Sequence, residues 1–191
     1  TIAETASVFG EMLVFDSLRG SVQGKELLAL LMGMIEEVFA TIFRQHAMYK
    51  FEQDFHAARR KEGELKTEVI SDMWINRQRE MFGSSVTLRD DYRIWWSYIP
   101  HFLHTPFYVY AYTFGELLTL SFYDLYKKTD DKSGFAEKYV AMLEAGGTKT
   151  PEELVEPFGI DLASKEFWEG GLEVVGEMVE EAKRLYRDAI V

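Results

Sequence analysis

The chain has 191 residues, of which 47% are hydrophobic, and its formal net charge is −11. Binding to a phosphate backbone needs clustered Lys and Arg, and the 21 basic residues are scattered among 32 acidic ones, which argues against nucleic acid as a partner. The absence of cysteine excludes disulfides and thiolate metal sites, and it suits a reducing compartment.

Nothing in the sequence resembles a membrane span or a secretory signal. The longest apolar run, residues 27–35, is followed by Glu36 and Glu37. It is far shorter than the ~20 residues that cross a bilayer, and no charged segment precedes an apolar one at the start of the sequence. We therefore expect a soluble, cytoplasmic protein with no membrane partner.

Helical periodicity begins within the first residues and continues through the first half of the chain. The predicted helices here cover residues 2–18, 25–62, 66–82 and 87–96. Residues 25–62 could form one helix of roughly 50 Å or two helices joined by a kink. Arg19-Gly20 and Gly83 are end signals, and Thr87-Leu88-Arg89-Asp90 has the pattern of a capping box that opens a short helix.

In the second half, the predicted helices cover residues 107–127, 135–145 and 165–187. Thr105-Pro106 has the residue types of an N-cap and first helical position. Residues 107–127 are apolar on nearly every side, as in a buried central helix, and Thr150-Pro151-Glu152-Glu153 is a second capping box. No segment alternates with the period of two that is typical of strands. The sequence thus predicts an all-α fold: a single domain over residues 1–191, with seven to nine helices packed around residues 107–127.

Two segments carry residues that could do chemistry, and the first runs from Glu4 to Glu11. These two carboxylates are seven residues apart, so two helical turns place them on one face. Such a pair could bind a metal ion and support its ligands, but paired acids on a helix are more often simply solvated. The spacing leaves both interpretations open.

The second segment runs from His101 to Tyr112. His101 and His104 stand three residues apart in a turn, and Tyr108 and Tyr112 share a helical face from which Tyr110 points away. Imidazole and phenol groups can donate hydrogen bonds to a developing oxyanion. Alternatively, His101 caps a turn, and the tyrosines fill a core with their hydroxyls bonded to the backbone.

Several common site patterns are missing. The sequence has no Glu-x-x-His, the pattern of di-iron bundles, no glycine-rich phosphate loop, no nucleophile elbow and no His-Glu-x-x-His. His46 and His56 are ten residues apart on a charged helix and share no evident set of ligands.

Three stretches form recognisable motifs: residues 3–13, AETASVFGEML; residues 98–118, which include YIPHF, TPFYVYAY and FGELL; and residues 150–168, which include TPEEL, GIDL and FW. In this order, and over essentially the whole chain, they resemble the oligoendopeptidase F family of thimet-type zinc metallopeptidases. The first resembles the helix that follows the zinc motif, the second the substrate-facing loop and helix, and the third the C-terminal end.

The resemblance implies that Glu4 matches the glutamate that supplies the third protein ligand to zinc, and that Glu11 matches a nearby acid. In the family, a His-Glu-x-x-His helix lies upstream. Its histidines are two zinc ligands, and its Glu is the general base for the attacking water. The chain lacks this motif. We therefore expect zinc in the complete enzyme, weak or no zinc binding by this fragment, and no hydrolysis by the fragment alone.

The resemblance also implies roles in the second segment. His101 matches the loop histidine that contacts the substrate or the tetrahedral intermediate, and Tyr112 matches the tyrosine that stabilises the oxyanion. A shift of one residue would exchange the roles of the tyrosines, so Tyr108 and Tyr110 are also candidates. His104 has a counterpart in the family, and no role is assigned to it.

The expected function is therefore that of the C-terminal part of a zinc metalloendopeptidase that hydrolyses oligopeptides by metal-activated water. The alternative is a non-catalytic helical module, derived from the same fold, that binds peptides or a partner chain. A homodimer that covers exposed apolar surface is a further open arrangement. A His-Glu-x-x-His motif in the reading frame upstream of Thr1 would decide for the enzyme.

Overall fold

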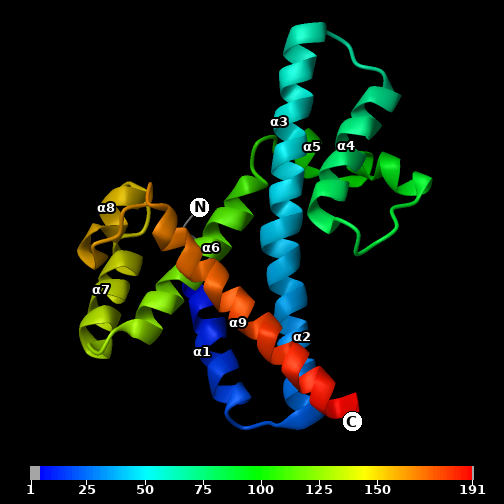
Figure 1. The fold of residues 1–191 in the computed structure, drawn as a ribbon. Helices are drawn as coiled ribbons and strands as arrows, with labels where there is room; N and C mark the ends of the chain where they lie inside the picture. Colours follow the sequence, from blue (N-terminus) through cyan, green and yellow to red (C-terminus); the bar gives the residue numbers. More distant parts are fainter. Residues whose placement is uncertain (1–4, 191) are drawn as a thin grey trace. The chain divides into compact units, whose positions relative to one another are not determined.

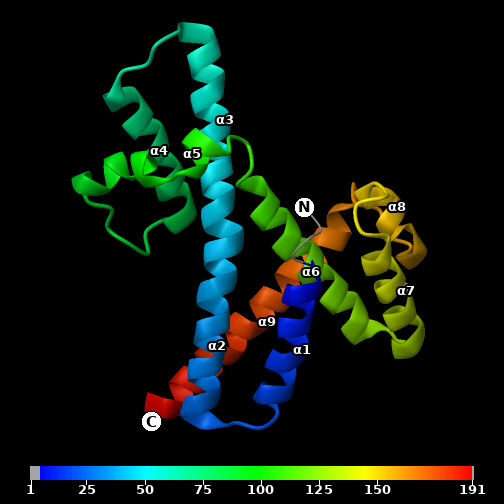
Figure 2. The ribbon, with the colours of Figure 1, turned by 180° about the vertical axis from the view of Figure 1, so that it is seen from behind.

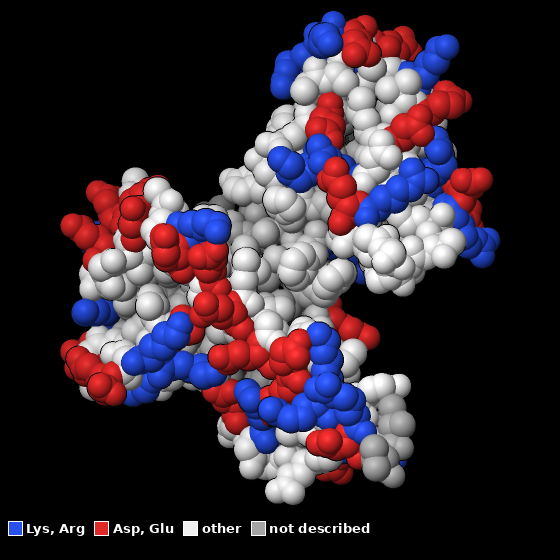
Figure 3. Space-filling model, viewed as in Figure 1, with Lys and Arg blue, Asp and Glu red and all other residues white. Residues whose placement is uncertain are grey.

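The computed structural model describes residues 5–190 and contains helices joined by turns, with no strand among these residues (Figure 1). The prediction of an all-α fold is confirmed. The chain forms two compact units, one of residues 1–38 and 114–191 and the other of residues 39–113. The prediction of a single domain over residues 1–191 stays a prediction. On the face shown in Figure 3, acidic and basic side chains interleave over the surface of each unit.

The unit of residues 39–113 is built on α3 (Gln45–Glu62), which packs along α4 (Thr67–Phe82). Figures 1 and 2 both show these two helices side by side. The 3₁₀ helix η2 (Asp90–Tyr98) covers α4, and the short α5 (His101–His104) follows it. The buried centre combines side chains from α3, α4 and the loop before α6, namely Met48, Phe51, Trp74 and Val109.

A π-helical segment, η1 (Ala40–Arg44), directly precedes α3. It follows α2 (Gly24–Phe39), and the backbone stays helical at Phe39 and Gln45. A π-helical turn leaves carbonyl groups without their usual α-helical partners. The hydroxyl of Thr113 donates a hydrogen bond of 3.1 Å to the carbonyl of Ile42, so this distortion helps to fix the start of α6.

The other unit contains α1 (Thr5–Arg19), most of α6 (Tyr110–Lys128) and α7 (Lys132–Ala145). It also contains α8 (Pro151–Val155), the 3₁₀ helix η3 (Glu156–Phe158) and α9 (Lys165–Ile190). Its core is aromatic: the ring of Phe9 contacts those of Tyr123, Phe135 and Tyr139. Helices α6 and α9 approach closely at Gly171, where an added Cβ would lie 2.7 Å from the hydroxyl oxygen of Ser121.

Most predicted elements are confirmed, and three predicted helix starts are wrong. The helix expected from Phe135 begins at Lys132, because the side chain of Asp131 accepts a hydrogen bond from the Gly134 N–H and caps the helix there. The helix expected from Phe107 begins at Tyr110, because Phe107 has a φ of 62°, which is outside the helical region. The helix expected at Thr87 begins at Asp90 as a 3₁₀ helix, and Arg89 at its N-cap makes no side-chain capping bond. The capping box of Thr150 with Glu153 is present as predicted.

Candidate functional site

The structure brings His101 and Tyr112 together, although they belong to different helices. The Nε2 atom of His101 lies 3.1 Å from the hydroxyl oxygen of Tyr112, within hydrogen-bonding distance. His101 opens α5, directly after Pro100, and Tyr112 lies in the first turn of α6. Both side chains are half-buried, so each keeps a polar group within reach of a bound molecule.

Tyr108 joins this pair. Its ring meets that of Tyr112 edge to face at 5.5 Å, and Tyr108 is 47% exposed. Tyr110 contacts Tyr49 of α3 instead, at 5.9 Å between ring centroids. The expected separation of Tyr110 from the other two tyrosines is therefore present, although Tyr108 lies before the helix rather than within it. His101, Tyr108 and Tyr112 form one cluster, which we call the imidazole–phenol cluster.

Apolar packing and one hydrogen bond to a buried carboxylate hold the loop between α5 and α6 in place. Val109 is fully buried, and Phe102 of α5 packs against Phe51 at 5.1 Å between ring centroids. Glu52 is 1% exposed and accepts a hydrogen bond of 2.6 Å from the backbone N–H of Phe107. These contacts position the residues on either side of the imidazole–phenol cluster.

Glu52 was not identified from the sequence as a site residue. A signal for it exists: Glu52 lies four residues after Met48 and next to Phe51, within the apolar stripe of α3. A carboxylate at such a position is buried and needs a partner. His104, by contrast, is exposed, and its side chain makes no hydrogen bond with the described residues.

Of the two acids predicted for the segment from Glu4 to Glu11, the structure describes only Glu11. Glu4 lies outside the described residues. Glu11 on α1 approaches Glu37 and Glu116, and burial together with these two neighbours raises the pKa of Glu116 to about 7. Partial burial, and then the charge of Glu37, also raises the pKa of Glu11.

Within residues 5–190, no three His, Cys, Asp or Glu side chains are arranged to hold a metal ion. The trio of Glu11, Glu37 and Glu116 is close enough to alter pKa values without forming a set of ligands. The described residues therefore do not by themselves fit a zinc centre. None of the helices in this part of the chain is both long and apolar enough to cross a membrane.

Comparison with known proteins shows the family to which this helical chain belongs. The model of Peptidase family M3 matches residues 1–174, and the chain belongs to that family. The resemblance seen in the sequence is thereby confirmed.

Among the relatives, the Oligoendopeptidase F homolog of Borreliella burgdorferi is 28% identical over 97% of this chain and 31% of its own length. Oligopeptidase PepF of Bacillus subtilis is 26% identical over 96% of this chain and 27% of its own length. The chain thus spans less than a third of the length of these two curated relatives. The crystal structure of oligoendopeptidase-F from Enterococcus faecium has the same fold, with a TM-score of 0.87 at 23% identity, over 98% of this chain and 36% of that one.

Proposed function

We propose that this chain is the C-terminal part of a zinc-dependent oligoendopeptidase, and that His101 and Tyr112 donate hydrogen bonds to the peptide at the bond that is cleaved. The observation that supports this most is the 3.1 Å contact between His101 Nε2 and the hydroxyl of Tyr112. It pairs an imidazole and a phenol, both of which can donate hydrogen bonds to an oxyanion, and both come from the segment that resembles the family's substrate-facing loop and helix.

Both groups suit the stabilisation of negative charge on a carbonyl oxygen. A phenol hydroxyl held by an imidazole is preorganised, so it loses little freedom when it turns to the oxyanion. Tyr108 meets the ring of Tyr112 edge to face and restricts its movement further. We assign the oxyanion contact to Tyr112 and the substrate contact to His101, with Tyr108 as the neighbouring candidate.

The substrate class, short peptides, is proposed from the names of the relatives, which are oligoendopeptidases and oligopeptidases. Zinc and the ligand role of Glu4 are also part of the proposal. Since the described residues do not fit a zinc centre, we assign no catalytic step to the metal. We further propose that residues 1–191 alone do not hydrolyse peptides.

The test uses the complete protein encoded by the reading frame that contains this chain. Tyr112→Phe removes only the hydroxyl and should lower kcat/KM for a fluorogenic oligopeptide by ~10²-fold. Bound zinc, measured by atomic emission, should stay at the wild-type level. Tyr186→Phe is the matched control, because Tyr186 is exposed on α9 and belongs neither to the imidazole–phenol cluster nor to its neighbouring loop, and it should change the rate less than threefold. An unchanged rate in Tyr112→Phe would reject the oxyanion role.

A further inference from the structure

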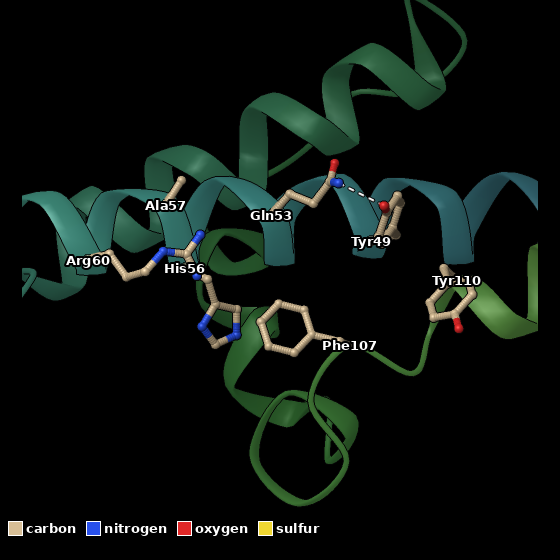
Figure 4. A pocket seen from close by; sticks show the side chains of 7 residues that line it. All are labelled: Tyr49, Gln53, His56, Ala57, Arg60, Phe107 and Tyr110. Carbon is tan, nitrogen blue, oxygen red and sulfur yellow. Dashed lines mark hydrogen bonds between the residues drawn. The ribbon is translucent and has the colours of Figure 1, made fainter.

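A hollow with a volume of about 520 Å³ lies beside α3, on the side to which Tyr110 points. Its walls include the rings of Tyr49, His56, Phe107 and Tyr110 and the side chain of Arg60 (Figure 4). The rings of His56 and Phe107 lie side by side at 4.4 Å between centroids. We call this hollow the α3 pocket. It has no role in the function proposed above.

One residue that lines the α3 pocket, Phe107, has an unfavourable backbone conformation. Phe107 has a φ of 62°, the one positive value among the non-glycine residues described, and it is 48% exposed. Bulky residues seldom adopt this conformation, which persists only where the surroundings enforce it and which often marks a binding site. Here the buried Glu52 enforces it by accepting the hydrogen bond from the Phe107 N–H.

Glu52 also lies behind His56. Its Oε1 atom is 3.9 Å from His56 Nε2, and its Oε2 atom is buried without a hydrogen-bond partner among the described residues. A buried carboxylate with unused capacity favours positive charge or donated hydrogen bonds nearby. The negative charge behind the pocket wall therefore helps to fix His56, which faces the hollow together with Phe107.

Arg60 supplies positive charge at the same end of the pocket as His56, and Tyr110 lies at the opposite end (Figure 4). It follows His56 by four residues, so both lie on one face of α3. Arg60 is exposed and forms no ion pair with the described residues. In contrast, Arg19, Arg77 and Arg93 are all paired with acids. A guanidinium that is unpaired in a chain of net charge −11 remains available to an anionic ligand.

We propose that the α3 pocket binds the C-terminal residue of a short peptide, with its carboxylate on Arg60 and an apolar or aromatic side chain between Phe107 and Tyr110. Guanidinium and carboxylate form paired, parallel hydrogen bonds, and the aromatic rings give apolar surface to the side chain. The side chain of an Asp or Glu within a peptide also carries a carboxylate, so the test has to distinguish it from the C-terminal carboxylate. This inference rests on the proposed function, because that function supplies the peptide.

The test is equilibrium binding by calorimetry to the complete protein encoded by the reading frame, without added metal. The probes are Ala-Gly hexapeptides that end in Phe, as the free acid and as the amide, and an amidated peptide with one internal Glu. Wild type should bind the free acid about tenfold more tightly than either amidated peptide. A tight complex with the internal-Glu amide would contradict the choice of the C-terminal carboxylate.

Two variants identify the pocket. Arg60→Gln should abolish the tenfold preference for the free acid, whereas the neighbouring Arg59→Gln, an equal change of charge, should keep it. Phe107→Gly removes the ring but suits a φ of 62°, so the fold should persist. This variant should lose the preference for a peptide that ends in Phe over one that ends in Gly. Equal losses in Arg59→Gln and Arg60→Gln, or an unchanged side-chain preference in Phe107→Gly, would overturn the proposal.

Hydrolysis assays separate this inference from the proposed function. If the protein cleaves peptides, Arg60→Gln should raise KM for free-acid substrates about tenfold and leave kcat within twofold. If Tyr112→Phe leaves the rate unchanged while Arg60→Gln loses the free-acid preference, the oxyanion assignment fails and the pocket stands. If Tyr112→Phe lowers the rate and Arg60→Gln binds both peptide forms as wild type does, the pocket assignment fails alone.

Discussion

The carboxylate of Glu52 accepts a hydrogen bond of 2.6 Å from the backbone N–H of Phe107, which lies 55 residues further along the chain. This bond joins the middle of α3 to the loop before α6. It holds Phe107 at positive φ and keeps this residue outside the helix that begins at Tyr110. The loop that carries Tyr108 is therefore positioned by a buried charge rather than by its own sequence.

Replacing Glu52 should show how much this bond contributes. Glu52→Ala removes the acceptor and leaves a gap in a buried position, so we expect a loss of about 2 kcal/mol in the free energy of unfolding. Glu52→Gln keeps an oxygen that can accept from the Phe107 N–H, and it should lose less than half of that. Urea unfolding followed by Trp fluorescence measures both values, because Trp74 lies in the same core. Equal losses in the two variants would show that the hydrogen bond contributes nothing beyond packing.

The close approach of α6 and α9 depends on Gly171. In Gly171→Ala the new Cβ would lie 3.0 Å from the backbone carbonyl oxygen of Leu117, as well as 2.7 Å from the hydroxyl oxygen of Ser121. Since a backbone atom cannot move aside as a side chain can, we expect the free energy of unfolding to fall by about 2 kcal/mol.

Gly176 of the same helix is the matched control, because no atom lies within 4 Å of a Cβ added there and the residue is exposed. Gly176→Ala should raise the stability by about 0.5–1 kcal/mol, since Ala is the better helix former. Thermal unfolding by circular dichroism compares the two variants. Opposite signs are expected, and destabilisation by both would contradict the close approach at Gly171.

The half-buried Glu116 predicts a dependence of stability on pH. Its pKa is raised from 4.5 to about 7, first by burial and then by the charges of Glu11 and Glu37. The folded state therefore binds this proton more tightly than the unfolded state does. The stability that results is fully present below pH 4.5 and is lost as the pH rises through 7.

Glu116→Gln is neutral at every pH and should escape this loss. After allowance for the partial exposure of the carboxyl, we expect the variant to be about 2 kcal/mol more stable than wild type at about pH 8 and nearly equal to it at about pH 4.5. Urea unfolding at the two pH values measures this difference. Glu137→Gln, at an exposed position on α7, should show no such change, and a pH-independent effect of Glu116→Gln would refute the prediction.

The sequence was most informative where interactions are local. The capping box of Thr150 and Glu153 closes within four residues, so its pattern alone predicts the start of α8. The end of α4 at Gly83, which has a φ of 55°, was predicted for the same reason. The contact between Tyr108 and Tyr112 was also predicted from their spacing, but Tyr108 lies before α6, so helical periodicity does not account for it.

Local patterns failed where a distant residue competes for the same group. Thr105-Pro106 predicts a helix start, but Glu52 takes the N–H of Phe107, and the helix begins three residues later. The π-helical form of η1 within the long helical segment was likewise not predicted, since its Ile42 carbonyl finds a partner in Thr113, 71 residues away. Neither partner can be inferred from the sequence around the affected helix.

By itself, the sequence determined that the protein is all-helical, that it belongs with peptidases of family M3, and which side chains are available for chemistry. Periodicity, capping residues and motif spacing act over a few residues and need no knowledge of the fold. Only the tertiary structure placed His101 against Tyr112 and Glu52 behind Phe107, and it left Arg60 unpaired at the end of the α3 pocket. These relationships depend on which helices pack together, and burial then decides which charges and hydrogen bonds find a partner.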